Sequence, residues 1–217
     1  MNIRQLVLIL KSLRVGVLHG MPMAEKDRDP FDIFGEWFGT ARDAGLYLPE
    51  AMTLATSTVD GIPSARMVLL KGCDQDGFTF FTNYGSRKSS ELDDNPRAAL
   101  VFHWNVLQRQ VRITGPVKRV AQEESEAYFK TRPRGSRIAA WASRQSRRLV
   151  DRADLERAFE DKRKEYDGGE VPLPEFWGGY RLQPDDIEFW QGKANRMHDR
   201  LLFRRRESGW VSEWLYP

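Results

Sequence analysis

The sequence predicts a predominantly antiparallel β-barrel of six to eight strands with peripheral α-helices. Short apolar segments of strand length follow one another, with tight turns between them, which is typical of an antiparallel meander or barrel. The 217 residues, 41% of them hydrophobic, are enough for one large core. No internal repeat, low-complexity tract or linker divides the chain, so we expect a single domain over residues 29–217.

Residues 1–28 form a basic leader that we expect to be flexible. Residues 1–24 contain Arg4, Lys11 and Arg14 and no acidic residue, which accounts for the whole net charge of +3. The apolar run 6–10 is too short for a signal-peptide core and is followed at once by Lys11. Because the remaining chain is formally neutral, a general nucleic-acid-binding surface is not expected.

Membrane, disulfide and metal chemistry are also not expected. No apolar run approaches the ~20 residues that a membrane span needs. The single cysteine, Cys73, cannot form an intrachain disulfide and fits a reducing compartment, so we expect a cytoplasmic protein. The three histidines are scattered in the sequence, which disfavours a zinc site.

The first regular element is a helix that begins at Asp29-Pro30 and ends at Gly45. Asp is a favoured N-cap, Pro fits the first turn, and Gly favours the C-terminus. Aromatic residues between them recur at helical spacing, and we interpret this stripe as core packing.

Three strands follow, at residues 51–58, 64–71 and 78–83. Asp60-Gly61 indicates the turn between the first two, and residues 73–77 read as a second turn. The middle strand is apolar in its centre, with Arg66 and Lys71 near its ends.

The next segment, residues 82–91, reads TNYGSRKSSE and predicts a short helix with Ser86 as N-cap, ending before Pro96. Arg87 and Lys88 then lie at the positive end of the helix dipole, where cations are disfavoured. A bound anion would resolve that conflict. A solvated basic turn is the alternative from this segment alone.

Two further strands are expected at 97–104 and 109–120, the second broken by Gly115-Pro116, and then a helix at 123–130. Tyr128 and Arg132 are four residues apart, so they share a face if the last helical turn persists, and Ser136 lies just beyond. Two hydroxyls and a guanidinium suit a phosphomonoester. A tyrosine packed on an arginine stem is the alternative.

A helix closing at residues 141–146 and a second helix, capped by Asp151 and running to about Tyr166, precede the last set of strands, which runs from Trp177 to Leu215. Within it, residues 187–190 read as a buried strand, followed by a bend. In an extended chain, Arg196, His198 and Arg200 would then share one face, as a cationic wall or as a solvated row.

Several stretches together resemble the pyridoxine (pyridoxamine) 5′-phosphate oxidases, over roughly residues 29–213. Residues 187–200, IEFWQGKANRMHDR, match the family's C-terminal signature, including Glu188, Trp190 and Asp199. Residues 82–88 resemble its TN-x-x-SRK segment, and residues 141–146 resemble its W-x-S-x-QS segment.

The resemblance implies an FMN-binding split barrel that forms homodimers with FMN between the subunits. It implies oxidation of pyridoxamine or pyridoxine 5′-phosphate to pyridoxal 5′-phosphate, with O₂ as acceptor and H₂O₂ as product. The implied catalytic residues are Arg196 and His198, and the implied substrate residues are these two with Lys71, Tyr128, Arg132 and Ser136. The implied FMN residues are Arg66, Met67, Val68, Leu69, Leu70, Lys71, Phe81, Thr82, Arg87, Lys88, Gln110, Gln145, Ser146, Trp190 and Arg200.

Two positions depart from the family pattern. The family often has an Arg-x-x-Tyr pair near the N-terminus, whereas Arg14 is followed by Val17, and Trp214 replaces the arginine of the usual C-terminal Arg-Leu-x-Pro. Two alternatives therefore stand: a split-barrel FMN oxidoreductase with another substrate, and a non-catalytic binder of FMN or pyridoxal phosphate. The complete set of implied substrate residues favours the oxidase over the first.

Overall fold

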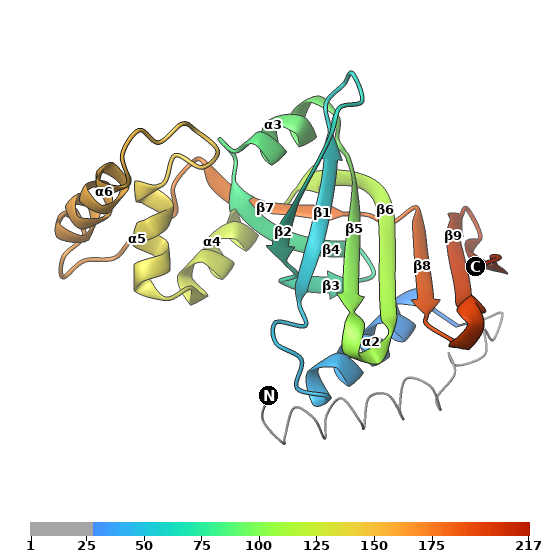
Figure 1. Ribbon diagram of the computed structural model, residues 1–217. Coiled ribbons are helices and arrows are strands. Elements are labelled where there is room, and N and C mark those ends of the chain that lie inside the picture. Colours follow the sequence, from blue (N-terminus) through green and yellow to red (C-terminus); the bar gives the residue numbers. More distant parts are fainter. Residues whose placement is uncertain (1–27) are drawn as a thin grey trace.

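The structure is a computed structural model that describes residues 28–217. Residues 1–27 of the expected leader therefore lie outside the described residues. The described chain forms one curled antiparallel sheet with five α-helices around it (Figure 1). The predicted fold class is confirmed, although the sheet has ten strands and not six to eight.

The sheet has a main path and a branch. The main path runs β10-β9-β8-β6-β5-β1-β2, and in the branch β4 pairs with β3 and β7 while β7 returns to β6. The strands are β1 (Ala51–Ser57), β2 (Pro63–Leu69), β3 (Gly72–Asp74), β4 (Gly77–Asn83), β5 (Arg97–Trp104), β6 (Arg109–Arg119), β7 (Trp177–Leu182), β8 (Asp186–Gln191), β9 (Asp199–Arg206) and β10 (Gly209–Trp214).

The helices lie at the periphery, as expected. Figure 1 shows α4, α5 and α6 grouped on the side of the sheet away from β8 and β9. The helices are α2 (Pro30–Asp43), α3 (Arg87–Asp94), α4 (Gln122–Thr131), α5 (Arg134–Ala142) and α6 (Arg152–Glu165). Two 3₁₀ turns, η1 (Asn105–Leu107) and η2 (Ala194–Arg196), interrupt the loops after β5 and β8.

Helix α2 supplies the aromatic stripe that the sequence predicts, and this stripe packs in the core. The Asp29 carboxylate caps the helix by accepting from the Phe31 N–H at 2.7 Å. Phe34 packs edge-on against Phe78 and Phe102, with ring centroids 5.0 and 5.1 Å away. Full burial of each such side chain stabilises the fold by about 1.5–3 kcal/mol.

The expected break in the strand at Gly115-Pro116 is wrong. β6 runs through both residues and changes partner there: Pro116 still pairs with β5, and Val117 begins the pairing with β7. Gly115 permits this crossing, because an added Cβ would lie 1.9 Å from the Gln183 carbonyl oxygen. The expected turn at 73–77 is also partly strand, since β3 pairs with the start of β4.

The expected extended row at residues 196–200 is wrong as well. Residues 194–196 form the turn η2, in which Asn195 and Arg196 have left-handed φ angles of 57° and 61°. β9 begins only at Asp199. Strand alternation therefore does not place Arg196 on a common face with His198 and Arg200.

Replacing Gly115 with alanine tests the partner change. We expect the Gly115→Ala variant to lose about 1–3 kcal/mol of unfolding free energy, because the new methyl group meets backbone that cannot move away. Urea unfolding followed by circular dichroism measures this loss. The matched control is Gly39→Ala in α2, where nothing lies within 4 Å; it should gain up to about 1 kcal/mol from helix propensity. Equal stabilities for the two variants would contradict the prediction.

Candidate active site

A cleft of about 770 Å³ lies along β2, between this strand and the segments around α3, α4 and α5. Its described lining residues include several cations and no acidic residue. The cations are Arg66, Lys71, Arg87, Lys88 and Arg132. A cleft with this charge attracts an anionic ligand.

Lys88 is the most buried of these cations, with 8% of its surface exposed. Its Nζ donates to Thr82 Oγ1 and Ser86 Oγ at 3.1 Å and to Gln145 Oε1 at 2.6 Å. It makes no ion pair with any carboxylate in the described part of the chain. Burial, helped by the Arg66 charge, lowers the pKa of Lys88 to about 8. A buried ammonium with only neutral partners is a position for an anion.

The start of α3 adds backbone donors to this anion position. Ser86 is the N-cap, as predicted, but its hydroxyl does not cap the helix. It accepts from Lys88 instead. The first N–H groups of a helix have no intrahelical acceptor, so they remain available to a ligand.

Glu91 holds the two neighbouring guanidinium groups in place. Its carboxylate is buried and accepts from Arg87 Nε at 2.8 Å, and Arg66 Nη2 lies 3.3 Å away. Burial alone would raise the pKa of Glu91, but hydrogen bonds from Ser64, Thr56 and Arg87, with the Arg66 charge, lower the pKa to about 2. Glu91 therefore stays ionised at neutral pH and fixes the geometry of the first cation group, which is Arg66, Arg87 and Lys88.

A second cation group, Lys71 and Arg132, lies beside an aromatic stack. The rings of Phe81 and Tyr128 stack with centroids 4.1 Å apart, and the Arg132 guanidinium covers the Trp177 ring at 4.6 Å. Helix α4 ends at Thr131, so Arg132 follows in extended conformation, yet it lines the cleft together with Tyr128 and Ser136. Arg132 Nη1 is buried without a hydrogen-bond partner. A buried unpaired guanidinium N–H is a donor prepared for a ligand.

Strand β2 forms one wall of the cleft and is an edge strand. It pairs with β1 only, so the N–H and C=O groups on its other edge are not used in the sheet. Residues 66–69 line the cleft. Leu70 does not line it; its side chain belongs to the hydrophobic core. Phe81, Thr82, Gln145 and Ser146 complete the predicted cofactor residues at the cleft.

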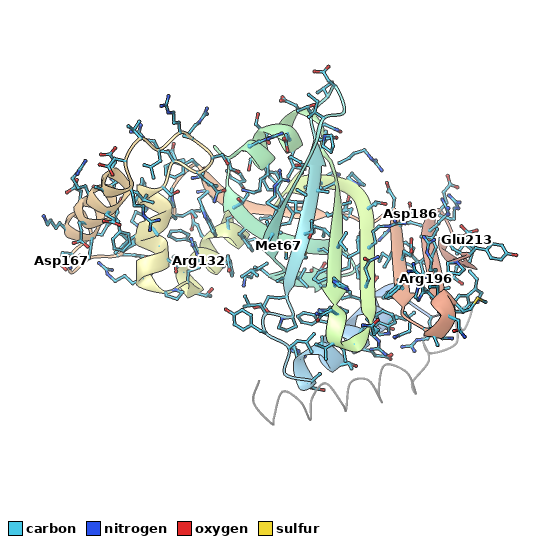
Figure 2. The ribbon with its side chains drawn as sticks, in the orientation of Figure 1. Met67, Arg132, Asp167, Asp186, Arg196 and Glu213 are labelled. Carbon is cyan, nitrogen blue, oxygen red and sulfur yellow. The ribbon has the colours of Figure 1, made fainter. Side chains whose placement is uncertain are left out.

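The other predicted site residues lie elsewhere in the chain, on β6, β8, β9 and the η2 turn. Three strands, β6, β5 and β1, separate β8 from β2 in the sheet. In Figure 2, Arg132 lies on the left of the sheet, Met67 near the middle and Arg196 on the right. A single chain therefore does not bring the two sets into one cleft. The separated residues are Gln110, Trp190, Arg196, His198 and Arg200.

Four of these separated residues form a cluster of their own, and Arg196 lies in the η2 turn beside it. Gln110 pairs with Trp190 across β6 and β8, and Trp190 packs on the His198 ring with centroids 4.7 Å apart. Arg200 Nε donates to the buried Glu188 carboxylate at 2.8 Å, and Arg200 Nη1 donates to the Tyr216 carbonyl at 3.0 Å. Contacts from β8 and from the C-terminal segment thus orient the cluster.

Some site residues were not found from the sequence. Glu91 follows Arg87 by four residues, a spacing typical of helical ion pairs, and this signal was available. Trp177 was read only as the start of a strand, and nothing in the sequence indicates that it lies under Arg132.

In the described residues no helix is long and apolar enough to cross a membrane. Over the same residues, no group of three or more His, Cys, Asp or Glu side chains is placed to hold a metal ion.

A curled antiparallel half-barrel with a cationic cleft on its edge strand defines a protein of the FMN-binding split-barrel class. Comparison with known families is more specific. Residues 40–164 match the family model "Pyridoxamine 5′-phosphate oxidase", and residues 177–217 match "Pyridoxine 5′-phosphate oxidase C-terminal dimerisation region". The chain belongs to the pyridoxamine 5′-phosphate oxidase family, which confirms the resemblance.

Relatives in bacteria are similar over almost their full length. The pyridoxine/pyridoxamine 5′-phosphate oxidase of Rubrobacter xylanophilus is 56% identical, with 88% of each chain covered. That of Psychromonas ingrahamii is 52% identical, with 95% of each covered. Among solved structures, PhzG from Burkholderia lata in complex with tetrahydrophenazine-1-carboxylic acid has a TM-score of 0.88 at 30% identity, covering 93% of this chain and 100% of that chain. An FMN-binding protein from Nostoc punctiforme shares the fold, with a TM-score of 0.69 and 18% identity, over 88% of this chain and 100% of that chain.

The lowered pKa of Lys88 predicts how FMN affinity depends on pH. Below about pH 8 the ammonium is charged and attracts the phosphate; above it, the free protein holds neutral Lys88 and must take up a proton to bind. The affinity of the FMN-free protein should therefore fall as pH rises from 7 to 9, by up to roughly tenfold per pH unit. Quenching of FMN fluorescence measures it. In the control Lys88→Arg the charge persists, and a slope as steep as that of the wild type would contradict the prediction.

Proposed function

We propose that this chain oxidises pyridoxamine 5′-phosphate and pyridoxine 5′-phosphate to pyridoxal 5′-phosphate with bound FMN and O₂. The observation that carries the proposal is a single cleft with two cation groups and no described acidic lining residue. Cofactor and substrate each bring one phosphate, so two separate groups match two phosphorylated ligands. Membership in the oxidase family supports the same activity.

FMN fits the first cation group. Arg66, Arg87 and Lys88 would hold its phosphate, together with the first N–H groups of α3. The free edge of β2 at residues 67–69 offers backbone donors and acceptors to the polar edge of the flavin. When bound, FMN supplies the redox chemistry, since it takes a hydride from the substrate and is reoxidised by O₂ to give H₂O₂.

The substrate phosphate fits the second cation group. Lys71, Arg132, Tyr128 and Ser136 present two cations and two hydroxyls to the same part of the cleft. The unpaired Nη1 of Arg132 gains an acceptor in this arrangement. Anchoring the phosphate there places the substrate ring along β2, where the flavin would lie.

The cluster of Gln110, Trp190, Arg196, His198 and Arg200 would complete the cleft from a second copy of the chain. Its position far from β2 within one chain supports this division, and so does the match of residues 177–217 to the family's dimerisation region. Arg196 of one subunit would then cover the outer face of the substrate ring bound to its partner, a cation–π arrangement.

His198 would act as a hydrogen-bond donor to the substrate. Its Nδ1 accepts from the Lys193 backbone N–H at 3.1 Å, so neutral His198 carries its proton on Nε2. That N–H can donate to the phenolic oxygen of the substrate ring. Released protons would pass to water, which for the amine substrate also replaces the departing nitrogen as ammonia is lost.

The two alternatives predict different outcomes. A split-barrel oxidoreductase with another substrate is represented by PhzG, which is similar in fold and holds a phenazine carboxylate. Such a substrate has no phosphate to occupy Lys71 and Arg132, which weighs against this alternative. A non-catalytic binder would hold FMN but produce no peroxide. Cys73, the single cysteine, is free and fits a reducing compartment such as the cytoplasm.

An aerobic peroxide assay with pyridoxamine 5′-phosphate tests the activity, and Arg196→Ala tests the active face. We expect this variant to keep its FMN but to lose roughly 100-fold in kcat/KM, because the substrate ring loses its outer contact. Flavin absorbance measures cofactor content. Arg206→Ala, which removes an exposed arginine at the end of β9, is the matched control and should match the wild type. Near-normal turnover of Arg196→Ala would show that the active face is assigned wrongly.

Mixing two inactive variants tests the shared cleft. We expect Lys71→Ala/Arg132→Ala and Arg196→Ala, co-expressed with different tags, to recover about a quarter of wild-type activity per site in the unpurified mixture and about half in the isolated mixed dimers. Random pairing makes half of the dimers mixed, and each mixed dimer has one intact and one doubly defective cleft. Purification through both tags isolates these dimers. Activity no higher than the mean of the parents would place both sets in one chain.

A further inference from the structure

We infer that Gln191 and Arg109 are positioning residues that hold segment 192–198, and with it Arg196 and His198, in the geometry needed for turnover. The inference rests on the proposed function and goes beyond it, because neither residue lines the cleft or reaches the residues that would contact substrate. The two side chains instead lie beneath the cluster, on the other face of the same strands.

Gln191, the last residue of β8, connects two loops through a single side chain. It has 0% exposure. Its Nε2 donates to the carbonyls of Leu107 and Gln108 at 3.3 and 3.1 Å, in the loop between β5 and β6. The Gly192 N–H donates to the Gln108 carbonyl at 2.7 Å. The first residue of segment 192–198 is thereby fixed to the neighbouring loop.

Arg109 fixes the other end of the Gln191 amide. Its Nε donates to Gln191 Oε1 at 3.0 Å, and its guanidinium lies over the Trp37 ring at 4.4 Å. Arg109 is buried and makes no ion pair with a described carboxylate, although the Glu36 charge acts on it from α2. Burying a cation in this way is costly. Its orientation also determines which way round the Gln191 amide lies, so that Nε2 faces the loop carbonyls.

Strand alternation separates this pair from the cluster that it supports. Gln110 pairs with Trp190, and the next pair in the same register is Arg109 with Gln191. Because successive side chains point to opposite faces, Gln110 and Trp190 face the proposed cleft while Arg109 and Gln191 face α2 and the core.

The segment needs such support because its backbone is strained. Gln108, Asn195 and Arg196 all have positive φ angles, of 53°, 57° and 61°. Such conformations persist only where the surroundings fix them. Beyond Gly192, the segment is closed by the partly exposed Lys193–Asp199 ion pair at 2.5 Å and by the Lys193 N–H, which donates to His198 Nδ1 at 3.1 Å. The buried hydrogen bonds of Gln191, with that of the Gly192 N–H, attach the start of the segment to the loop between β5 and β6.

The experiment is the Gln191→Met variant, which keeps the shape of the side chain and removes its hydrogen bonds. We expect kcat/KM for pyridoxamine 5′-phosphate to fall at least ~10-fold, while the FMN dissociation constant changes less than ~3-fold, because the FMN phosphate is held elsewhere. Amide hydrogen exchange in residues 192–198 should become faster. Combining Arg109→Met with Gln191→Met should cost little more than Gln191→Met alone, because the two act as a unit.

Tyr180→Phe is the matched control for a general loss of stability. It removes a partly buried hydrogen bond, from the Tyr180 hydroxyl to Asp93 at 3.2 Å, away from the segment. Kinetics and exchange in 192–198 should stay as in the wild type. If Gln191→Met does not fold, Gln191→Glu replaces it as the test variant. The glutamate keeps the acceptor for Arg109 and loses the donor to the loop carbonyls. The same fall in kcat/KM and the same faster exchange in residues 192–198 are expected.

Unchanged kcat/KM together with unchanged exchange in 192–198 would overturn the inference. Equal losses in Tyr180→Phe and Gln191→Met would overturn it too, because they would reflect stability alone. If the wild-type protein does not oxidise pyridoxamine 5′-phosphate, the proposed function fails. Amide hydrogen exchange in residues 192–198 then still tests the role of Gln191. Faster exchange in Gln191→Met than in the wild type supports that role, and unchanged exchange overturns it.

Discussion

The site depends on a buried positive charge that the described protein does not neutralise. Lys88 lies among the hydroxyls of Thr82 and Ser86 and the amide of Gln145, with Arg66 close enough to lower its pKa. Burying an ammonium among neutral partners destabilises the folded protein unless an anion binds beside it. The one nearby carboxylate, Glu91, is already committed to Arg66 and Arg87. It therefore orients the cations without cancelling the field that a phosphate would meet.

The sheet explains why one chain keeps the two proposed halves of the site apart. β2 ends the main path at one edge and presents the first half, whereas the second half lies on β8 and β9, which three and four strands separate from β2. Each half is attached to the rigid sheet by buried polar contacts: Glu91 in the first, and Glu188 and Gln191 in the second. Two preorganised halves can thus meet across a subunit boundary without either having to fold on binding.

Local chemistry predicted most elements, and long-range contacts account for the misses. Caps such as Asp29 and Asp151, and the positions of β1 and β5, depend on neighbours in sequence and were predicted correctly. Gly115 was predicted to break the strand. A local sequence pattern does not show that the backbone of residue 183 occupies the space that a Cβ at position 115 would need. A bend was predicted after residue 190, but it extends further than expected, because Arg196 still belongs to the turn and has a left-handed φ angle.

The site residues follow the same rule. The motif around Arg87 and Lys88 was recognised from its unfavourable position at a helix start, which is a local signal. The wide separation of Arg196 from Arg132 could not be predicted, because a motif gives residue roles and not the strand order that places them.

The open edge of β2 has a consequence for the protein before its ligand arrives. Exposed strand edges are usually guarded by lysines, bulges or covering loops against pairing with other chains. Residues 66–69 keep their edge unpaired at the cleft. A ligand seated along this edge would therefore also cover backbone groups that could otherwise pair with a strand of another chain.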